Sequence, residues 1–104
     1  MCGYAGFVSK GRSLGERELG FLDAFDRMLQ HRGPSEGGMY RGDGFAVAHR
    51  RLSIIDVGHG QQPMLSADGR VGIAYNGEIY NYRTLRVELE AKGCRFHTDC
   101  DTEV

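Results

Sequence analysis

Glycine recurs along this chain at about twice its usual frequency, which indicates a fold with many tight turns or close backbone approaches. Sixteen of the 104 residues are glycine, against an average share of about 7%. Glycine adopts backbone conformations that other residues avoid, and it leaves room for a neighbouring segment. At this length the chain fits one domain at most, with a single hydrophobic core.

Between the turns, the hydrophobic pattern predicts short strands. They are expected over residues 2–8, 45–50, 52–55, 64–66, 71–75 and 95–98. Asp68-Gly69 lies between two of these segments and predicts a type I′ hairpin, because glycine supplies a positive φ at the second turn position.

A first helix is predicted to begin at a capping box formed by Ser13 and Glu16 and to run to about Gln30. Gly residues weaken its first half, because glycine has a low helix propensity. Pro34 and the Gly37-Gly38 pair are then expected to end regular structure in this part of the chain.

A second helix is predicted over residues 82–92, with Asn81 as N-cap and Gly93 just past its end. Residues 101–104 are typical of the first turn of a further helix, and nothing completes that helix. The sequence is therefore expected to be a fragment of a larger domain.

Charge and hydropathy argue against several classes of protein. A net charge of −1 disfavours nucleic-acid and polybasic membrane surfaces, since both need an excess of Lys and Arg. The apolar stretch at residues 4–8 is too short for a signal peptide or a membrane span. We therefore expect a cytoplasmic protein with no nucleic-acid or membrane partner, and with its three cysteines reduced.

Cys2 is a candidate nucleophile because of its position. Removal of the initiator Met1 is expected, since a small residue follows it, and would leave Cys2 with a free α-amino group. Such an amine has an ordinary pKa of about 7.7–8.0, so it could act as general base for the thiol of the same residue. The alternative interpretation is a small buried residue on an edge strand.

Asn76 and Gly77 are candidate oxyanion donors. The side-chain amide of Asn76 and the backbone N–H of Gly77 could both point to a developing tetrahedral oxyanion. The alternative is an ordinary turn, because Asn-Gly after an apolar strand is a common turn sequence.

Arg51 and Asp101 could together recognise the two ends of a free amino acid. An arginine binds a carboxylate through two hydrogen bonds, and a carboxylate binds an ammonium group. Each residue is alternatively a surface or structural charge. Arg50 cannot share the pocket of Arg51, because successive strand residues face opposite sides.

Zinc-ligand residue types occur as Cys94-x-x-His97-x-x-Cys100. Only one such cluster is present, however, and a tetrahedral site needs a fourth ligand that the sequence does not mark. Positions 94 and 97 would also face opposite sides of a strand. The sequence therefore favours no metal site.

These motifs, taken together, resemble a known family. They are Met1-Cys2-Gly3, His31-Arg32-Gly33-Pro34, Arg51-Leu52-Ser53-Ile54-Ile55-Asp56, Tyr75-Asn76-Gly77-Glu78-Ile79-Tyr80-Asn81 and Asp101-Thr102-Glu103-Val104. In this order they resemble the N-terminal glutaminase domain of glutamine-hydrolysing asparagine synthetases, which are class II glutamine amidotransferases. The resemblance covers essentially the whole chain.

The resemblance implies an α+β fold of the N-terminal-nucleophile hydrolase type. This fold is a four-layer α/β/β/α sandwich with mainly antiparallel sheets, of which residues 1–104 would be the N-terminal portion. It also implies roles for individual residues. Cys2 matches the nucleophile, Asn76 and Gly77 the oxyanion donors, Arg51 the ligand of the α-carboxylate of glutamine, and Asp101 the ligand of its α-ammonium group, while Gly77 and Glu78 line the glutamine pocket.

The implied reaction is hydrolysis of L-glutamine to glutamate and ammonia, which needs no cofactor. Ammonia would pass to a synthetase domain in the same full-length chain, which would use ATP and Mg²⁺ to make asparagine from aspartate and which this sequence lacks. The fragment alone is expected to be inactive, and a homodimer is one possible assembly. Two alternatives stay open: a non-catalytic or partner-pairing module of the same fold, and an amidotransferase domain of a related synthetase with another acceptor.

Overall fold

The computed structural model describes residues 2–104, so the expected removal of Met1 lies outside the described residues. The elements are the strands β1 (Gly3–Val8), β2 (Glu36–Gly42), β3 (Phe45–Arg51), β4 (Met64–Leu65) and β5 (Gly72–Ile73), the helices α1 (Glu16–Leu29) and α2 (Tyr82–Ala91), and a 3₁₀ turn η1 (Asp101–Glu103). They form an antiparallel sheet in the order β1-β3-β2 and a separate antiparallel pair, β4-β5.

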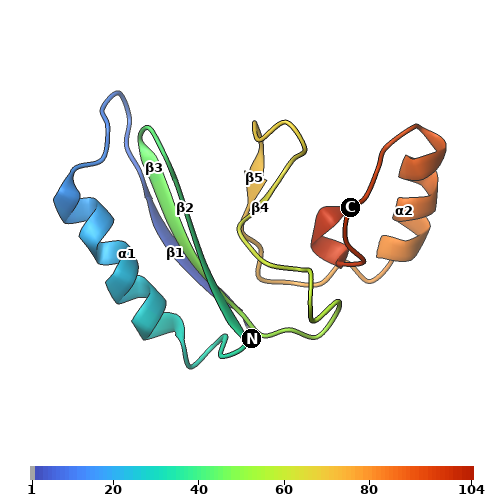
Figure 1. Ribbon diagram of the computed structural model, residues 1–104, viewed down its shortest axis with the longest axis horizontal. Coiled ribbons are helices and arrows are strands. Elements are labelled where there is room, and N and C mark those ends of the chain that lie inside the picture. Colours follow the sequence, from blue (N-terminus) through green and yellow to red (C-terminus); the bar gives the residue numbers. More distant parts are fainter. Residues whose placement is uncertain (1) are drawn as a thin grey trace.

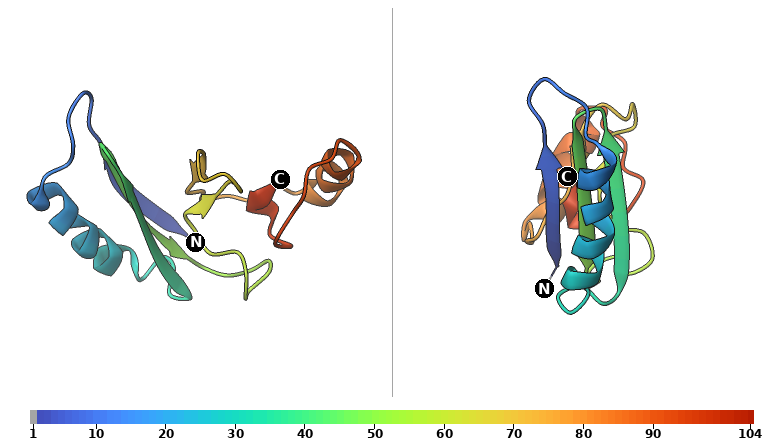
Figure 2. Two further views of the ribbon diagram at one scale, coloured as in Figure 1. Left: turned by 45° about the horizontal axis from the view of Figure 1, so that its top comes forward. Right: turned by 90° about the vertical axis from the view of Figure 1, so that its left-hand side faces the viewer.

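The elements follow one another along the longest axis of the molecule, which measures 45 Å. Figure 1 shows α1, then the three-stranded sheet, then the β4-β5 pair, and finally α2 with the C-terminus. Figure 2 shows from two further directions that α1 lies along one face of that sheet. The chain is therefore α+β with antiparallel sheets.

The core lies between α1 and β3. Leu22 of α1 packs with Ala46 and Ala48 of β3, and all three are buried. Phe7 of β1 stacks on Phe25 of α1, with 5.3 Å between the ring centroids. The small alanine side chains of β3 let the helix lie close to the sheet, while the aromatic rings fill the space beside them.

The predicted N-terminus of α1 is wrong by a few residues. Gly15 is the N-cap, and its backbone N–H donates to Glu18 Oε2 over 3.1 Å. Ser13 instead donates a hydrogen bond to Asp43 in the β2–β3 turn. The hydroxyl that was expected to cap the helix therefore ties the chain before α1 to the sheet.

β2 was not predicted, because its glycines indicated the end of regular structure. All seven of its residues pair with β3, from Glu36 opposite Arg51 to Gly42 opposite Phe45. Gly38 allows another segment to approach: a Cβ at this position would lie only 2.0 Å from the carbonyl oxygen of Gln62. Here glycine marks close packing rather than a strand end.

The predicted strands in the second half are mostly wrong or too long. Residues 52–55 and 95–98 form no strand, and the hairpin pairs only two residues on each side. Its turn is not type I′, because Gly69 has a positive φ (69°) and Asp68 does not. With so little pairing, hydrogen bonds from side chains hold this part of the chain.

The prediction of α2 is confirmed to within one residue. Asn81 is at the N-cap position, and Gly93 follows the helix with a φ of 92°. The Cys94 N–H bonds to the Leu89 carbonyl oxygen over 3.0 Å, which is the Schellman pattern. Within the described residues, 2–104, no helix has the length and apolar character needed to cross a membrane.

The close approach at Gly38 makes a prediction. In the full-length protein, Gly38→Ala should lower the opening free energy of the β2 amides by about 1–3 kcal/mol, because the new methyl group must displace the Gln62 backbone. Hydrogen–deuterium exchange measures this quantity locally. Gly20→Ala is the matched control, because a Cβ there meets nothing within 4 Å. Equal β2 protection in the two variants would contradict the prediction.

Candidate active site

The thiol of Cys2 lies beside the chain that leaves β3. The backbone N–H of Leu52 donates to Cys2 Sγ over 3.3 Å, and Arg32 Nε donates to the Cys2 carbonyl oxygen over 3.2 Å. The β1–β3 register begins at the next residue, with Gly3 opposite Arg50. Pairing of these two strands therefore brings residue 2 to the end of β3.

Arg51 is the last residue of β3 and is 4% exposed. Its Nη2 donates to the carbonyl oxygens of Ile55 (2.5 Å) and Asp56 (3.0 Å), and Nη1 lies 3.5 Å from Glu36 Oε2. The guanidinium has five N–H donors, so some remain for a ligand. Arg50 points the other way, into an ion pair with Asp26 of α1, as the alternation predicted.

Asp56 supports the loop that surrounds Arg51. It is the one described non-glycine residue with a positive φ (48°). Its Oδ2 accepts from the Asp99 N–H over 2.8 Å, and its Oδ1 lies 3.0 Å from His59 Nδ1. The hydrogen bond from Asp99 and the contact with His59 lower the pKa of the Asp56 carboxyl. The loop is thus tied to the chain near η1.

Asp101 opens η1 and is 5% exposed. Its Oδ2 accepts a hydrogen bond from the Ile79 N–H over 2.8 Å, and Cys100 Sγ lies 3.6 Å from Oδ1. Cys100 is the N-cap of η1, so Asp101 lies inside the turn. Asp101 joins η1 to the segment that follows Asn76 and Gly77.

Four of the six predicted site residues line one pocket: Cys2, Arg51, Glu78 and Asp101. The pocket has a volume of about 40 Å³, which is room for a few water molecules. A thiol, a cation and two carboxylates therefore meet in a space smaller than an amino acid. A ligand of that size requires the walls to move apart.

Asn76 and Gly77 are not among the residues that line this pocket. Both are exposed and lie in the irregular segment after β5. The ring of Tyr75 covers Gly77 so closely that a Cβ there would lie 2.5 Å from Tyr75 Oη. The structure thus does not bring the two candidate oxyanion donors to the thiol of Cys2.

The Cys94, His97 and Cys100 spacing does not build a metal site. Within residues 2–104, no three Cys, His, Asp or Glu side chains are grouped as metal ligands. Cys94 is exposed and Cys100 is buried.

Sequence reasoning missed two buried polar residues: Gln62, which lines the pocket of Cys2, and His49, which does not. His49 is 1% exposed and Gln62 is 7% exposed. Both form hydrogen bonds to the backbone of Tyr75. His49 could have been found from strand alternation, because it shares a face of β3 with Arg51. Nothing in the residue pattern marks Gln62.

Comparison with known proteins decides the family. The model of a family described as "Glutamine amidotransferase domain" matches residues 1–104 of the chain. The chain belongs to this family. The match covers the chain from end to end, and the expectation drawn from the sequence motifs is confirmed at this level.

The amidotransferase domain is also similar to curated asparagine synthetases. It is 45% identical over 107 residues to "Asparagine synthetase [glutamine-hydrolyzing] 1" of Bacillus subtilis, covering 100% of this chain and 17% of that protein. It is 44% identical over 78 residues to asparagine synthetase B of Escherichia coli, covering 75% and 14%. An Arabidopsis thaliana asparagine synthetase is 36% identical over 104 residues, covering 100% and 17%. The chain therefore spans about a sixth of the length of these relatives.

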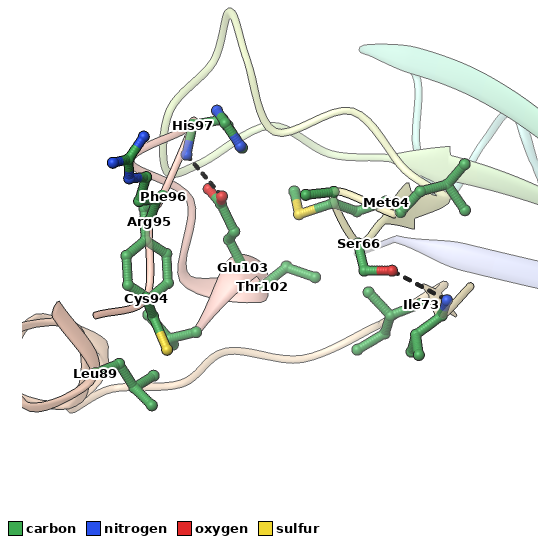
Figure 3. Close-up of a pocket in the computed structure, with 14 residues that line it drawn as sticks. Met64, Ser66, Ile73, Leu89, Cys94, Arg95, Phe96, His97, Thr102 and Glu103 are labelled. Carbon is green, nitrogen blue, oxygen red and sulfur yellow. Dashed lines mark hydrogen bonds between the residues drawn. The ribbon is translucent and has the colours of Figure 1, made fainter. Parts of the chain in front are cut away.

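A larger pocket of the amidotransferase domain, of about 410 Å³, lies between β4-β5 and the C-terminal segment. Figure 3 shows Glu103 at its edge, pointing to His97. Burial raises the pKa of Glu103, but hydrogen bonds from Thr98 and from the His97 N–H outweigh it, so the pKa is lowered overall. None of the six predicted site residues lines this pocket.

The burial of His49 predicts a pH effect. Burial lowers the pKa of His49 below 6.5, opposed by its bond to Tyr75 and aided by the nearby charge of Arg51. As the pH falls, this histidine therefore takes up its proton at a higher pH in the unfolded chain than in the folded domain. The stability of the domain should then fall as the pH drops below about 6.5. An NMR pH titration of the full-length protein should give the His49 ring signals a midpoint below pH 6.5. These signals are identified as the ones that His49→Gln removes. A midpoint at or above 6.5 would contradict this.

Proposed function

We propose that this amidotransferase domain hydrolyses L-glutamine to glutamate and ammonia, with Cys2 as the nucleophile. The observation that carries the proposal is the pocket that Cys2 shares with Arg51, Glu78 and Asp101. A thiol next to one buried cation and one buried carboxylate matches an amino acid whose side chain carries a carbonyl group.

The reaction is a two-step acyl transfer. Cys2 Sγ attacks the carboxamide carbon of glutamine, while the α-amine of Cys2 takes the thiol proton and passes it to the leaving nitrogen. The C–N bond breaks, ammonia leaves, and a γ-glutamyl thioester remains on Cys2. Water then attacks the thioester, which releases glutamate and restores the thiol. The free amine requires removal of Met1.

Substrate binding is assigned to the buried charges. Arg51 binds the α-carboxylate with the N–H groups that the loop carbonyls leave free, and Asp101 binds the α-ammonium group. Glu78 and Gly77 complete the glutamine pocket. Because the pocket is small in the free domain, binding must separate its walls.

We assign stabilisation of the tetrahedral oxyanion to the Asn76 side-chain amide and the Gly77 N–H. Both groups must move toward Cys2 when substrate binds, because neither lines the pocket of the free domain. Active-site hydrogen bonds often tighten only in the substrate complex. The exposure of Asn76 and Gly77 leaves these two residues free to make that movement.

We further infer that the domain continues as an α/β/β/α sandwich and delivers ammonia to a synthetase domain in the same protein. The order of α1, the sheet, the β4-β5 pair and α2 along the molecule supports the four layers (Figure 1). The names and greater lengths of the curated relatives support a synthetase domain. ATP and Mg²⁺ would belong to that domain, with aspartate or another carboxylate as acceptor.

A non-catalytic module of the same fold is the second candidate. The position of Asn76 and Gly77 outside the pocket favours it. Mass spectrometry of the N-terminus separates the two functions. A free Cys2 amine is expected for the enzyme, whereas retained Met1 would favour the module.

The nucleophile can be tested directly. Cys2→Ala in the full-length protein should reduce glutamine hydrolysis by at least about a thousandfold, because no other group can form the thioester. Glutamate release measures the rate. Cys94→Ala is the matched control, because Cys94 is exposed and lies outside the pocket. Wild-type turnover by Cys2→Ala would rule out the proposed mechanism.

Ammonium recognition gives a second test. Asp101→Asn should lower kcat/KM for glutamine about 10- to 100-fold, because a charged hydrogen bond is lost. For 4-carbamoylbutanoate, which lacks the α-amine, kcat/KM should change less than about threefold if Asp101 serves only that amine. Asp99→Asn is the control, since its side chain is 90% exposed. Equal losses with both substrates would show a structural role only.

A further inference from the structure

We propose that His49 and Gln62 are positioning residues that hold the backbone of Tyr75 from both sides and thereby fix the point from which Asn76 and Gly77 move to the oxyanion when substrate binds. We name the three residues the Tyr75 clamp. This inference rests on the proposed function and adds two residues to it. Gln62 lines the pocket of Cys2, whereas His49 is not among the residues that line it.

His49 holds the carbonyl side of Tyr75. Its Nε2 lies 3.1 Å from the Tyr75 carbonyl oxygen. A carbonyl can only accept, so Nε2 carries the hydrogen. The other ring nitrogen, Nδ1, is buried with no hydrogen-bond partner among residues 2–104. This arrangement fits a neutral ring with one fixed tautomer, and burial favours the neutral ring by lowering the pKa of His49.

Gln62 holds the amide side. Its Oε1 accepts from the Tyr75 N–H over 2.6 Å, and its Nε2 donates to Thr102 Oγ1 over 3.3 Å. Thr102 follows Asp101, the proposed ammonium ligand. The Gln62 backbone is itself fixed, because its carbonyl oxygen packs on Gly38 of β2.

The clamp takes the place of the strand-to-strand hydrogen bonds that are absent at Tyr75. β5 ends at Ile73, so the strand pairing that would fix the peptide groups of Tyr75 has already stopped. Two buried side chains satisfy both groups instead, one residue before Asn76. The same two residues connect this segment to Arg51 through β3 and to Asp101 through Thr102. The segment that carries the oxyanion donors is thus held by the same elements that carry the proposed substrate ligands.

A clamp of this kind should act on the transition state rather than on binding. Oxyanion donors stabilise charge that develops only during reaction, and small errors in their placement are costly. Loss of the clamp should therefore lower kcat with little change in KM. A residue needed only for folding would reduce the amount of active enzyme without depending on Asn76.

The test uses glutamine hydrolysis by the full-length protein. His49→Leu, which removes the donor, should lower kcat about 10- to 100-fold with KM within about threefold of wild type. His49→Gln keeps an N–H donor and should recover most of that loss. Gln62→Leu should behave like His49→Leu, and it tests the clamp even if the first variant does not fold. Gln61→Leu is its matched control, because Gln61 is the exposed neighbour and bonds only to Gly58.

Coupling to Asn76 completes the test. The single variant Asn76→Ala should lower kcat. In the double variant with His49→Leu, kcat should fall by less than the product of the two single effects. If the two losses in kcat simply multiply in the double variant, the clamp is overturned and the proposed function stays intact. A rise in KM at constant kcat in His49→Leu and Gln62→Leu would have the same meaning. An unchanged kcat in Asn76→Ala would instead overturn the oxyanion assignment, and the clamp with it.

Discussion

The antiparallel pairing of β3 on both edges is the constraint on which the rest of this domain depends. Pairing with β1 and β2 fixes the register, and the alternation of side chains then assigns each β3 residue to one face. Ala46, Ala48 and Arg50 meet α1, whereas His49 and Arg51 meet the opposite layer. A shift by one residue would exchange core and pocket.

Several residues of the pocket could be singled out from the sequence, because each carries a distinctive chemical type in a motif. Cys2, Arg51 and Asp101 were found from the chemistry that a thiol, a guanidinium and a carboxylate can perform, and the structure gathers them from three distant segments. Asn81 and Gly93 marked the two ends of α2, although the Asn81 side chain makes no capping hydrogen bond. The end at Gly93 could be predicted because its backbone motif involves only nearby residues.

The features that were missed depend on contacts between distant residues. β2 contains the Gly37-Gly38 pair, which taken alone indicates a break, and only the segment near Gln62 explains why residue 38 is a glycine. The segments at 52–55 and 95–98 have strand-like composition but find no partner in the described chain. Strand formation depends on such a partner, so composition alone overestimates it.

The way the loop holds Arg51 limits which sequence changes the loop can accept during evolution. Arg51 is held by the carbonyl oxygens of Ile55 and Asp56 rather than by their side chains. The backbone offers the same carbonyl whichever residue it carries, so replacement at Ile55 leaves this contact available. Insertion or deletion of a single residue between Arg51 and Asp56 would move both carbonyls. Divergent copies of this loop should therefore keep its length even where the residue at position 55 changes.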